Sequence, residues 1–175
     1  MQKLDNINNV NQFSSQNNQS SGYIKNLVHL IRLKLDNGSN FIEEVELLQD
    51  FQLTVEQLAN VEKLLILATN NFSGLTKLNE DLDDILSEYL QNYYVKKNKN
   101  SYIKYFTNFI SIEPSLNDNI QDTTVHALSV AKINLLNKNV ETSINQLSSL
   151  SDSEYFFAVW IKQAEYYVKV TNALN

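Results

Sequence analysis

ALSVAKINLL, the apolar run over residues 127–136, decides the fold of this chain together with the polar turn NKN over residues 137–139. Apolar residues recur in the run at three- and four-residue spacing, which is typical of a helix with one buried face. A short run, INQLSSL over residues 144–150, comes next, and AVWIKQA over residues 158–164 lies in a longer one. The longer run opens with Ser151 and Glu154, which have the spacing of a capping box. The sequence therefore predicts three helices in close succession.

The same periodicity predicts which side chains of this three-helix unit are buried. The expected inward positions are Leu128, Ala131, Leu135, Ile144, Leu147, Leu150, Phe157, Trp160, Ile161, Ala164 and Val168. Trp160 could anchor a partner, but a lone Trp between Phe157 and Ile161 is more typical of a core. Three tyrosines of the last helix are better candidates for contacts with a protein partner. They are Tyr155, Tyr166 and Tyr167.

Composition favours helices throughout. The chain has only 3 Gly and 1 Pro in 175 residues, few for the many turns of a sheet protein. Helices joined by Asn, Ser and Asp turns fit this composition better. We therefore predict an all-α fold, a helical bundle of about seven to eight helices with the three-helix unit at its C-terminal end.

The chain is predicted to divide into three parts. Residues 1–21 are mostly Asn, Gln and Ser without apolar periodicity, which predicts a disordered polar tail. Residues 22–112 have repeated helical signals and end in a basic, aromatic helix. Residues 113–175, after Pro114 and a polar linker, contain the three-helix unit, and Asp122 is expected to cap its first helix.

Helix boundaries can be predicted within residues 22–112. Gly38 follows an apolar run at the position of a helix stop. Thr54 and Gln57 form a capping box, and the helix that they open is expected to bury Leu58 and Val61. A long helix is predicted from about residue 75 to the region of residue 94.

Charge and cysteine content exclude several classes of protein. The net charge is −6, and because nucleic-acid binding needs clustered Lys and Arg, no nucleic-acid partner is expected. The absence of Cys excludes disulfides and thiol nucleophiles. No apolar run approaches the roughly 18 residues of a membrane-spanning helix, and the first 21 residues lack a signal-peptide core. We therefore expect the chain as given to be soluble.

Lysines interleaved with aromatic residues distinguish the segment over residues 93–112. A helix beginning near residue 100 would place the rings and Ile110 on one face, with lysines beside it. The membrane-contact candidates are Lys96, Lys97, Lys99, Tyr102, Lys104, Phe106, Phe109 and Ile110. Such a helix is typical of a membrane interface, where rings lie at headgroup level and lysines meet anionic phosphates. The alternative is an ordinary core face bordered by solvated lysines.

The order of these patterns resembles the C-terminal domain of mitofilin, specifically its alphaproteobacterial relatives. The resemblance rests on the Ala/Leu-rich run at 127–136, the turn at 137–139, the short helix at 144–150 and the Trp-containing helix at 158–164. Looser matches lie at residues 33–38, 41–48, 67–70 and 73–78, so the resemblance covers roughly residues 23–175. Typical members also have an N-terminal membrane helix and a long coiled coil, which have no counterpart in this sequence.

The resemblance implies a function that the residues alone do not. Mitofilins are membrane-organising scaffolds at the periplasmic face of the cell-envelope membrane or its mitochondrial equivalent. They act as homo-oligomers, and a lipid-binding amphipathic segment precedes their C-terminal domain. Residues 93–112 occupy the corresponding place in this chain.

Residues suited to catalysis are few. His29 and His126 are far apart and lack metal-ligating neighbours at helical spacing. The densest acidic cluster lies over residues 80–88 and alternates with Leu, Ile and Tyr, which is typical of a solvated helix face. No Gly-rich phosphate loop or nucleophile elbow is present in the sequence. We expect a protein that is not an enzyme and that has no cofactor or metal.

Two hypotheses remain. The first is a non-enzymatic, mitofilin-like membrane-organising scaffold that self-associates and contacts an anionic membrane. The second is a soluble helical protein-interaction adaptor without lipid contact, with its partner bound at the C-terminal helices.

Overall fold

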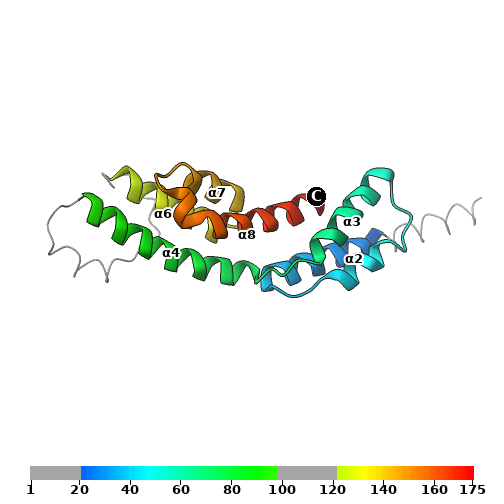
Figure 1. Ribbon diagram of the computed structural model, residues 1–175. Helices are drawn as coiled ribbons and strands as arrows, with labels where there is room; N and C mark the ends of the chain where they lie inside the picture. The colour runs from blue at the N-terminus through cyan, green and yellow to red at the C-terminus, as the bar shows by residue number, and fades with distance from the viewer. Residues whose placement is uncertain (1–20, 98–121) are drawn as a thin grey trace, which may run out of the picture. The chain divides into compact units, whose positions relative to one another are not determined.

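The computed structural model describes residues 21–97 and 122–175, and all its secondary structure in these ranges is helical (Figure 1). Seven helices lie in these described ranges, so the predicted all-α class is confirmed. The first covers residues 21–37. The others are α2 (Ile42–Leu48), α3 (Val55–Ala68), α4 (Gly74–Lys97), α6 (Thr123–Leu136), α7 (Val140–Ser148) and α8 (Ser153–Ala173). The predicted polar tail lies outside the described residues except Ser21, which already belongs to the first helix.

The chain forms two compact units. Unit 1 contains the described residues up to Asn71 together with Val170–Asn175, and unit 2 contains Phe72–Lys169. The predicted boundary near residue 112 lies outside the described residues. Within unit 2, α4 packs against α6 and α8, which are distant from it in the sequence.

Unit 1 is built on the antiparallel pairing of the first helix with α2. Leu27, Ile31 and Leu35 recur at four-residue spacing and are buried. Beside them the Lys34 ammonium lies 2.7 Å from the Glu44 carboxylate of α2. Between the two helices Gly38 has a φ of 71°, a left-handed conformation that glycine adopts without strain. The predicted stop at Gly38 is thus a real helix end.

The helix α3 begins as its sequence predicts. The Thr54 N–H donates to the Gln57 side chain at 2.9 Å, and the Gln57 N–H donates to the Thr54 hydroxyl at 3.2 Å. Val61 and Leu64 are buried, but Leu58 is 43% exposed, so its predicted inward position was wrong. It lies outside the buried face of the helix, which consists of Val61, Leu64 and Ala68.

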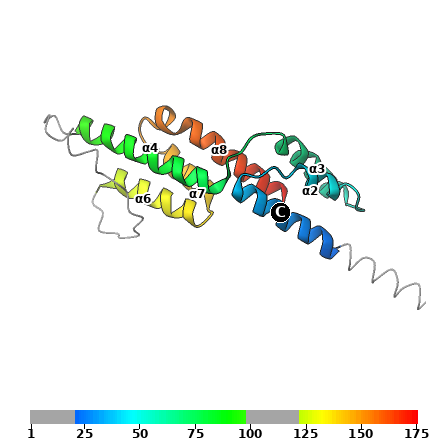
Figure 2. The same ribbon diagram turned by 90° about the horizontal axis from the view of Figure 1, so that it is seen from below.

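Unit 2 has its core where α4, α6 and α8 meet, and Figures 1 and 2 both show α6 and α8 lying along α4. Trp160 is buried, and its indole N–H donates to the Leu78 carbonyl of α4 at 2.8 Å. Lys132 of α6 is also buried, and its ammonium lies 2.8 Å from the Asp83 carboxylate and 3.1 Å from the Asn79 carbonyl. The prediction of Trp160 as a core residue is confirmed.

Tight turns connect the last three helices. Lys138 and Asp152 have φ values of 61° and 58°, the left-handed region that ends a helix abruptly. The turn at residues 137–139 is where the sequence predicted it. The helix α8 begins at Ser153, one residue later than the Ser151–Glu154 pattern predicts.

Candidate functional site

The C-terminal end of α4 carries a cluster of charged and phenolic groups, which we call the junction cluster. It consists of Tyr93, Lys96 and Lys97 of α4, Asp122 at the start of α6, and Asp152 in the turn before α8. The Lys97 ammonium lies 2.7 Å from the Asp122 carboxylate, and the Lys96 ammonium lies 2.6 Å from that of Asp152. The Tyr93 hydroxyl donates to Asp122 at 3.1 Å. Three helix ends are therefore joined at one place.

The Asp122 carboxylate both caps α6 and pairs with side chains of α4. It accepts hydrogen bonds from the Thr124 N–H at 3.0 Å and the Val125 N–H at 3.3 Å, which confirms the predicted helix cap. The same carboxylate binds Lys97 and Tyr93. A negative charge at this position also interacts favourably with the dipole of α6. The contact between Lys97 and Asp122 therefore joins the end of α4 to the start of α6.

Aromatic side chains surround the cluster. The Tyr89 ring lies 5.2 Å from Phe156 and 5.3 Å from Phe157, measured between centroids, and 6.5 Å from the Tyr93 ring. The Tyr89 hydroxyl donates to the Ser151 carbonyl at 3.1 Å. These contacts fix the end of α4 against the beginning of α8. The junction cluster thus sits on rigid, packed elements.

The electrostatics of the cluster stabilise both charges of its central pair. Burial raises the pKa of the Asp122 carboxyl, but hydrogen bonds from Lys97, from the first N–H groups of α6 and from Tyr93 outweigh it. The pKa of the Asp122 carboxyl therefore lies below its ordinary value. Hydrogen bonds to Asp122 and Tyr93 raise the pKa of the Lys97 ammonium above its ordinary value. Both groups are therefore charged at neutral pH.

Replacing Asp122 by asparagine is expected to lower the free energy of unfolding by about 1 kcal/mol at pH 7, because the cap survives and the ion pair does not. An aspartate with a lowered pKa in the folded state stabilises above its unfolded pKa and loses this contribution as pH falls through its folded pKa. The Asp122→Asn variant should therefore lose less stability than the wild type on acidification below about pH 4. Urea denaturation from pH 5 to pH 2 measures this.

The matched control is Asp152→Asn, which removes the carboxylate of the more exposed pair with Lys96. Asparagine tolerates the positive φ at this position, so the fold is kept. This variant should follow the wild-type pH profile closely. Equal flattening of the two profiles would contradict a special role for Asp122.

Only two of the predicted membrane-contact residues, Lys96 and Lys97, are among the residues that the structure describes. The ammonium groups of Lys96 and Lys97 form ion pairs with carboxylates of the same chain. The other candidates lie outside the described residues: Lys99, Tyr102, Lys104, Phe106, Phe109 and Ile110. The sequence did not indicate Asp122 or Asp152 as ion-pair partners, because each is far from its lysine along the chain.

The three predicted partner-contact tyrosines lie in different environments. Tyr155 is 81% exposed, as expected of a contact residue. Tyr166 is half-buried, with its ring 5.2 Å from Phe72. Tyr167 is only 7% exposed and its ring also lies near Phe72, so its prediction as a surface contact was wrong. Tyr167 continues the buried face of α8 three residues after Ala164, a spacing that could have indicated its burial.

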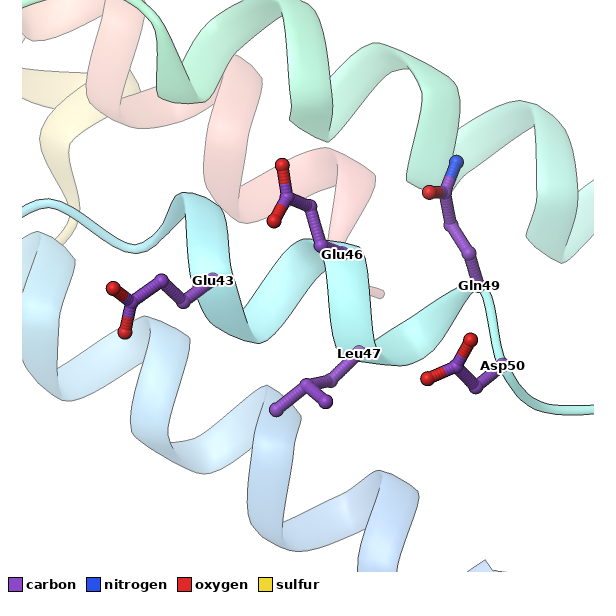
Figure 3. Close-up of a pocket in the computed structure, with 5 residues that line it drawn as sticks. All are labelled: Glu43, Glu46, Leu47, Gln49 and Asp50. Carbon is purple, nitrogen blue, oxygen red and sulfur yellow. The ribbon is translucent and has the colours of Figure 1, made fainter.

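Acidic side chains are the main polar feature of α2 and α4 in the described residues. Within residues 21–97 and 122–175 there is no group of three or more His, Cys, Asp or Glu side chains that could hold a metal ion. Part of the acidic cluster on α4 is paired: Lys77 lies 2.7 Å from Asp81, and Asp83 binds Lys132. Figure 3 shows a shallow depression around α2, lined mainly by Glu43, Glu46, Gln49 and Asp50 with Leu47. Three of its five lining residues are acidic, and the depression is open to solvent.

No helix within residues 21–97 and 122–175 has the length and apolar character needed to cross a bilayer.

Comparison of the chain with protein-family models, with curated proteins and with solved structures gives no match. The likeness to mitofilin therefore rests on the sequence patterns described above.

Proposed function

We propose that this chain is a non-enzymatic scaffold that binds other protein surfaces, including further copies of itself, through the exposed side of α8. The observation that supports this proposal is the exposure of Tyr155 and Val159, which are 81% and 79% exposed on successive turns of this helix. Residues four apart on a helix are neighbours, so the two side chains form one apolar patch. We call it the α8 patch.

The fold of unit 2 does not need the α8 patch. Phe157, Trp160 and Ala164 form the buried face of the helix and complete its packing against α4. Tyrosine is enriched at protein interfaces and is among the side chains that contribute most to binding. The patch is small, so a stable interface of at least about 1,000 Å2 would need surrounding residues as well.

The resemblance to mitofilin supports self-association, because members of that family act as oligomers. Members of that family act at the periplasmic face of a cell-envelope membrane, and we propose the same location for this chain, where many linked copies would organise the bilayer.

If the α8 patch is an interface, the double variant Tyr155→Asp/Val159→Asp should shift the chain from oligomer to monomer. Two charges in a buried apolar contact would weaken association by at least about 100-fold, since each unpaired charge costs several kcal/mol. Sedimentation velocity over a concentration series measures this. The control is Leu136→Asp, which changes a 52% exposed leucine of α6 in the same unit. A wild-type chain that is monomeric at every concentration would contradict self-association.

A second candidate function is contact with an anionic membrane surface. The observation that favours it is the sequence of residues 99–110, in which Lys99 and Lys104 alternate with aromatic residues. These lysines are separate from Lys96 and Lys97, whose charges are neutralised within the chain. The segment also holds the place of the lipid-binding segment in mitofilins. Its test is developed in the Discussion.

A further inference from the structure

The first helix, over residues 21–37, has apolar side chains outside the face that is buried in unit 1. Leu30 and Leu33 are 40% and 44% exposed and are neighbours on the helix surface. Asn26 precedes this pair by four positions, Asn37 follows it by four, and both asparagines are exposed. The exposed stripe therefore has the order Asn, Leu, Leu, Asn at spacings of four, three and four residues. We call it the first-helix stripe.

The spacing of the first-helix stripe is that of a seam between two paired helices. Positions that alternate at three and four residues stay on one side of a helix, as the a and d positions of a coiled coil do. The stripe covers eleven residue steps, or about 17 Å. Its order is the same when it is read backwards, since Asn26 and Asn37 occupy equivalent ends. An antiparallel helix with the same stripe would match it position by position.

A second copy of the chain, related by a two-fold axis, supplies such a helix. Asn26 of one copy would lie opposite Asn37 of the other, and each such contact occurs twice by symmetry. Leu30 and Leu33 would meet in the same way between the two Asn pairs. An amide both donates and accepts hydrogen bonds, so two facing asparagines satisfy each other. A helix with Leu at all four positions would instead bury the amides without partners, which is unfavourable.

The charges beside the stripe favour the antiparallel direction. Lys25 and Asp36 are eleven residues apart, about three turns, so they lie on the same flank near opposite ends of the helix. An antiparallel pair places Lys25 of one copy within about one turn of Asp36 of the other. A parallel pair would place the two lysines at the same level and align the two helix dipoles. We propose that the first-helix stripe pairs antiparallel with the same stripe of a second copy.

This pairing is expected to be weak. A stripe of about three turns falls short of the roughly 1,000 Å2 that a stable interface buries, so the pair is not retained during sedimentation. The stripe belongs to unit 1 and the α8 patch to unit 2, so they are separate surfaces. A copy that uses both has two different neighbours, and assembly then continues beyond a pair. This last consequence rests on the proposed function, whereas the pairing itself does not.

Disulfide trapping detects a weak pair, and the chain has no Cys of its own. One full-length chain carries Asn26→Cys and another carries Asn37→Cys, so an antiparallel pair joins the two thiols and keeps its second Asn pair. Both chains also carry Tyr155→Asp/Val159→Asp, which makes the result independent of the α8 patch. Under mild oxidation the mixed disulfide should exceed the two self-disulfides together at least about 10-fold, because pairing raises the local thiol concentration. Intact mass spectrometry measures the three species.

Two results of this experiment would overturn the proposal. An excess of the self-disulfides would mean that the helices pair in parallel. A control pair, Thr142→Cys with Asn145→Cys, places thiols at exposed positions of α7 in the same background. If the mixed disulfide of the stripe forms no faster than that of the control pair, the thiols meet only by random collision.

The apolar part of the contact is tested by adding Leu33→Asp to both chains. The mixed disulfide should then form at least about 10-fold more slowly, because a charge replaces an apolar contact in the seam. Leu58→Asp on α3 is the matched control, since Leu58 is 43% exposed and the charge changes equally. It should leave the rate unchanged, and equal slowing by the two variants would also overturn the proposal. Circular dichroism checks that both variants are folded.

Discussion

Replacing Trp160 by alanine is expected to lower the free energy of unfolding by about 3–5 kcal/mol, which is a large part of the stability of a small domain. The side chain is 2% exposed and lies between α8 and α4. Its removal would leave a cavity of indole size and would break the hydrogen bond to the Leu78 carbonyl. Urea denaturation followed by circular dichroism measures the loss.

Two further variants make this prediction specific. Trp160→Phe keeps most of the buried apolar area but removes the N–H donor, so about 1–3 kcal/mol should be lost. Lys162→Ala changes an exposed residue of the same helix and should stay within about 0.5 kcal/mol of the wild type. If Trp160→Ala were as stable as Lys162→Ala, Trp160 would not be the core residue that joins α8 to α4.

The features that the sequence predicted correctly depend on residues close together in the chain. The cap of α6 by Asp122 and the capping box of Thr54 and Gln57 involve residues within three positions of each other. Helix stops such as Gly38 are equally local. Local hydrogen bonding and backbone preference determine these features, so periodicity and capping residues were enough to predict the all-α class.

The features that the sequence did not predict depend on distant partners. The ion pairs of Lys96 and Lys97 join residues 56 and 25 positions apart, and a pattern of lysines beside aromatic rings cannot reveal them. Val168 was predicted to be buried and Tyr167 to be exposed. In the structure Val168 is partly exposed and Tyr167 is the more buried of the two. The Tyr167 ring lies near Phe72, a neighbour distant in the sequence, although the spacing of Tyr167 from Ala164 already indicated the buried face of α8.

The junction cluster changes how the membrane hypothesis must be tested. Substituting Lys96 or Lys97 would break contacts with Asp152 or Asp122 and perturb the fold as well as any lipid contact. Lys99 and Lys104 belong to the same charge pattern and lie outside the described residues. The informative variant is therefore Lys99→Glu/Lys104→Glu, and its control is Lys162→Glu/Lys169→Glu, which changes the net charge of the chain equally.

Reversing Lys99 and Lys104 is expected to weaken binding to anionic vesicles by at least about 30-fold. Each basic residue near an anionic surface contributes about 1 kcal/mol, so the two lost charges alone remove about 2 kcal/mol. The control variant on α8 should lose much less, because its lysines lie outside the segment that contains Tyr102, Phe106 and Phe109. Co-sedimentation with phosphatidylserine-containing vesicles at low salt measures both.

Phe106→Asp should weaken the same binding by a different mechanism, since it places a charge among acyl chains. Raising the salt from 0.1 M to 1 M shortens the Debye length from about 10 Å to about 3 Å. Added salt should therefore reproduce the effect of the lysine reversal and leave the relative defect of Phe106→Asp unchanged. If this face is instead core, Phe106→Asp will unfold the protein and the lysine reversal will change neither stability nor vesicle binding. If the wild-type chain does not bind anionic vesicles at low salt, the membrane function is excluded. The protein-binding scaffold would then be the remaining proposal.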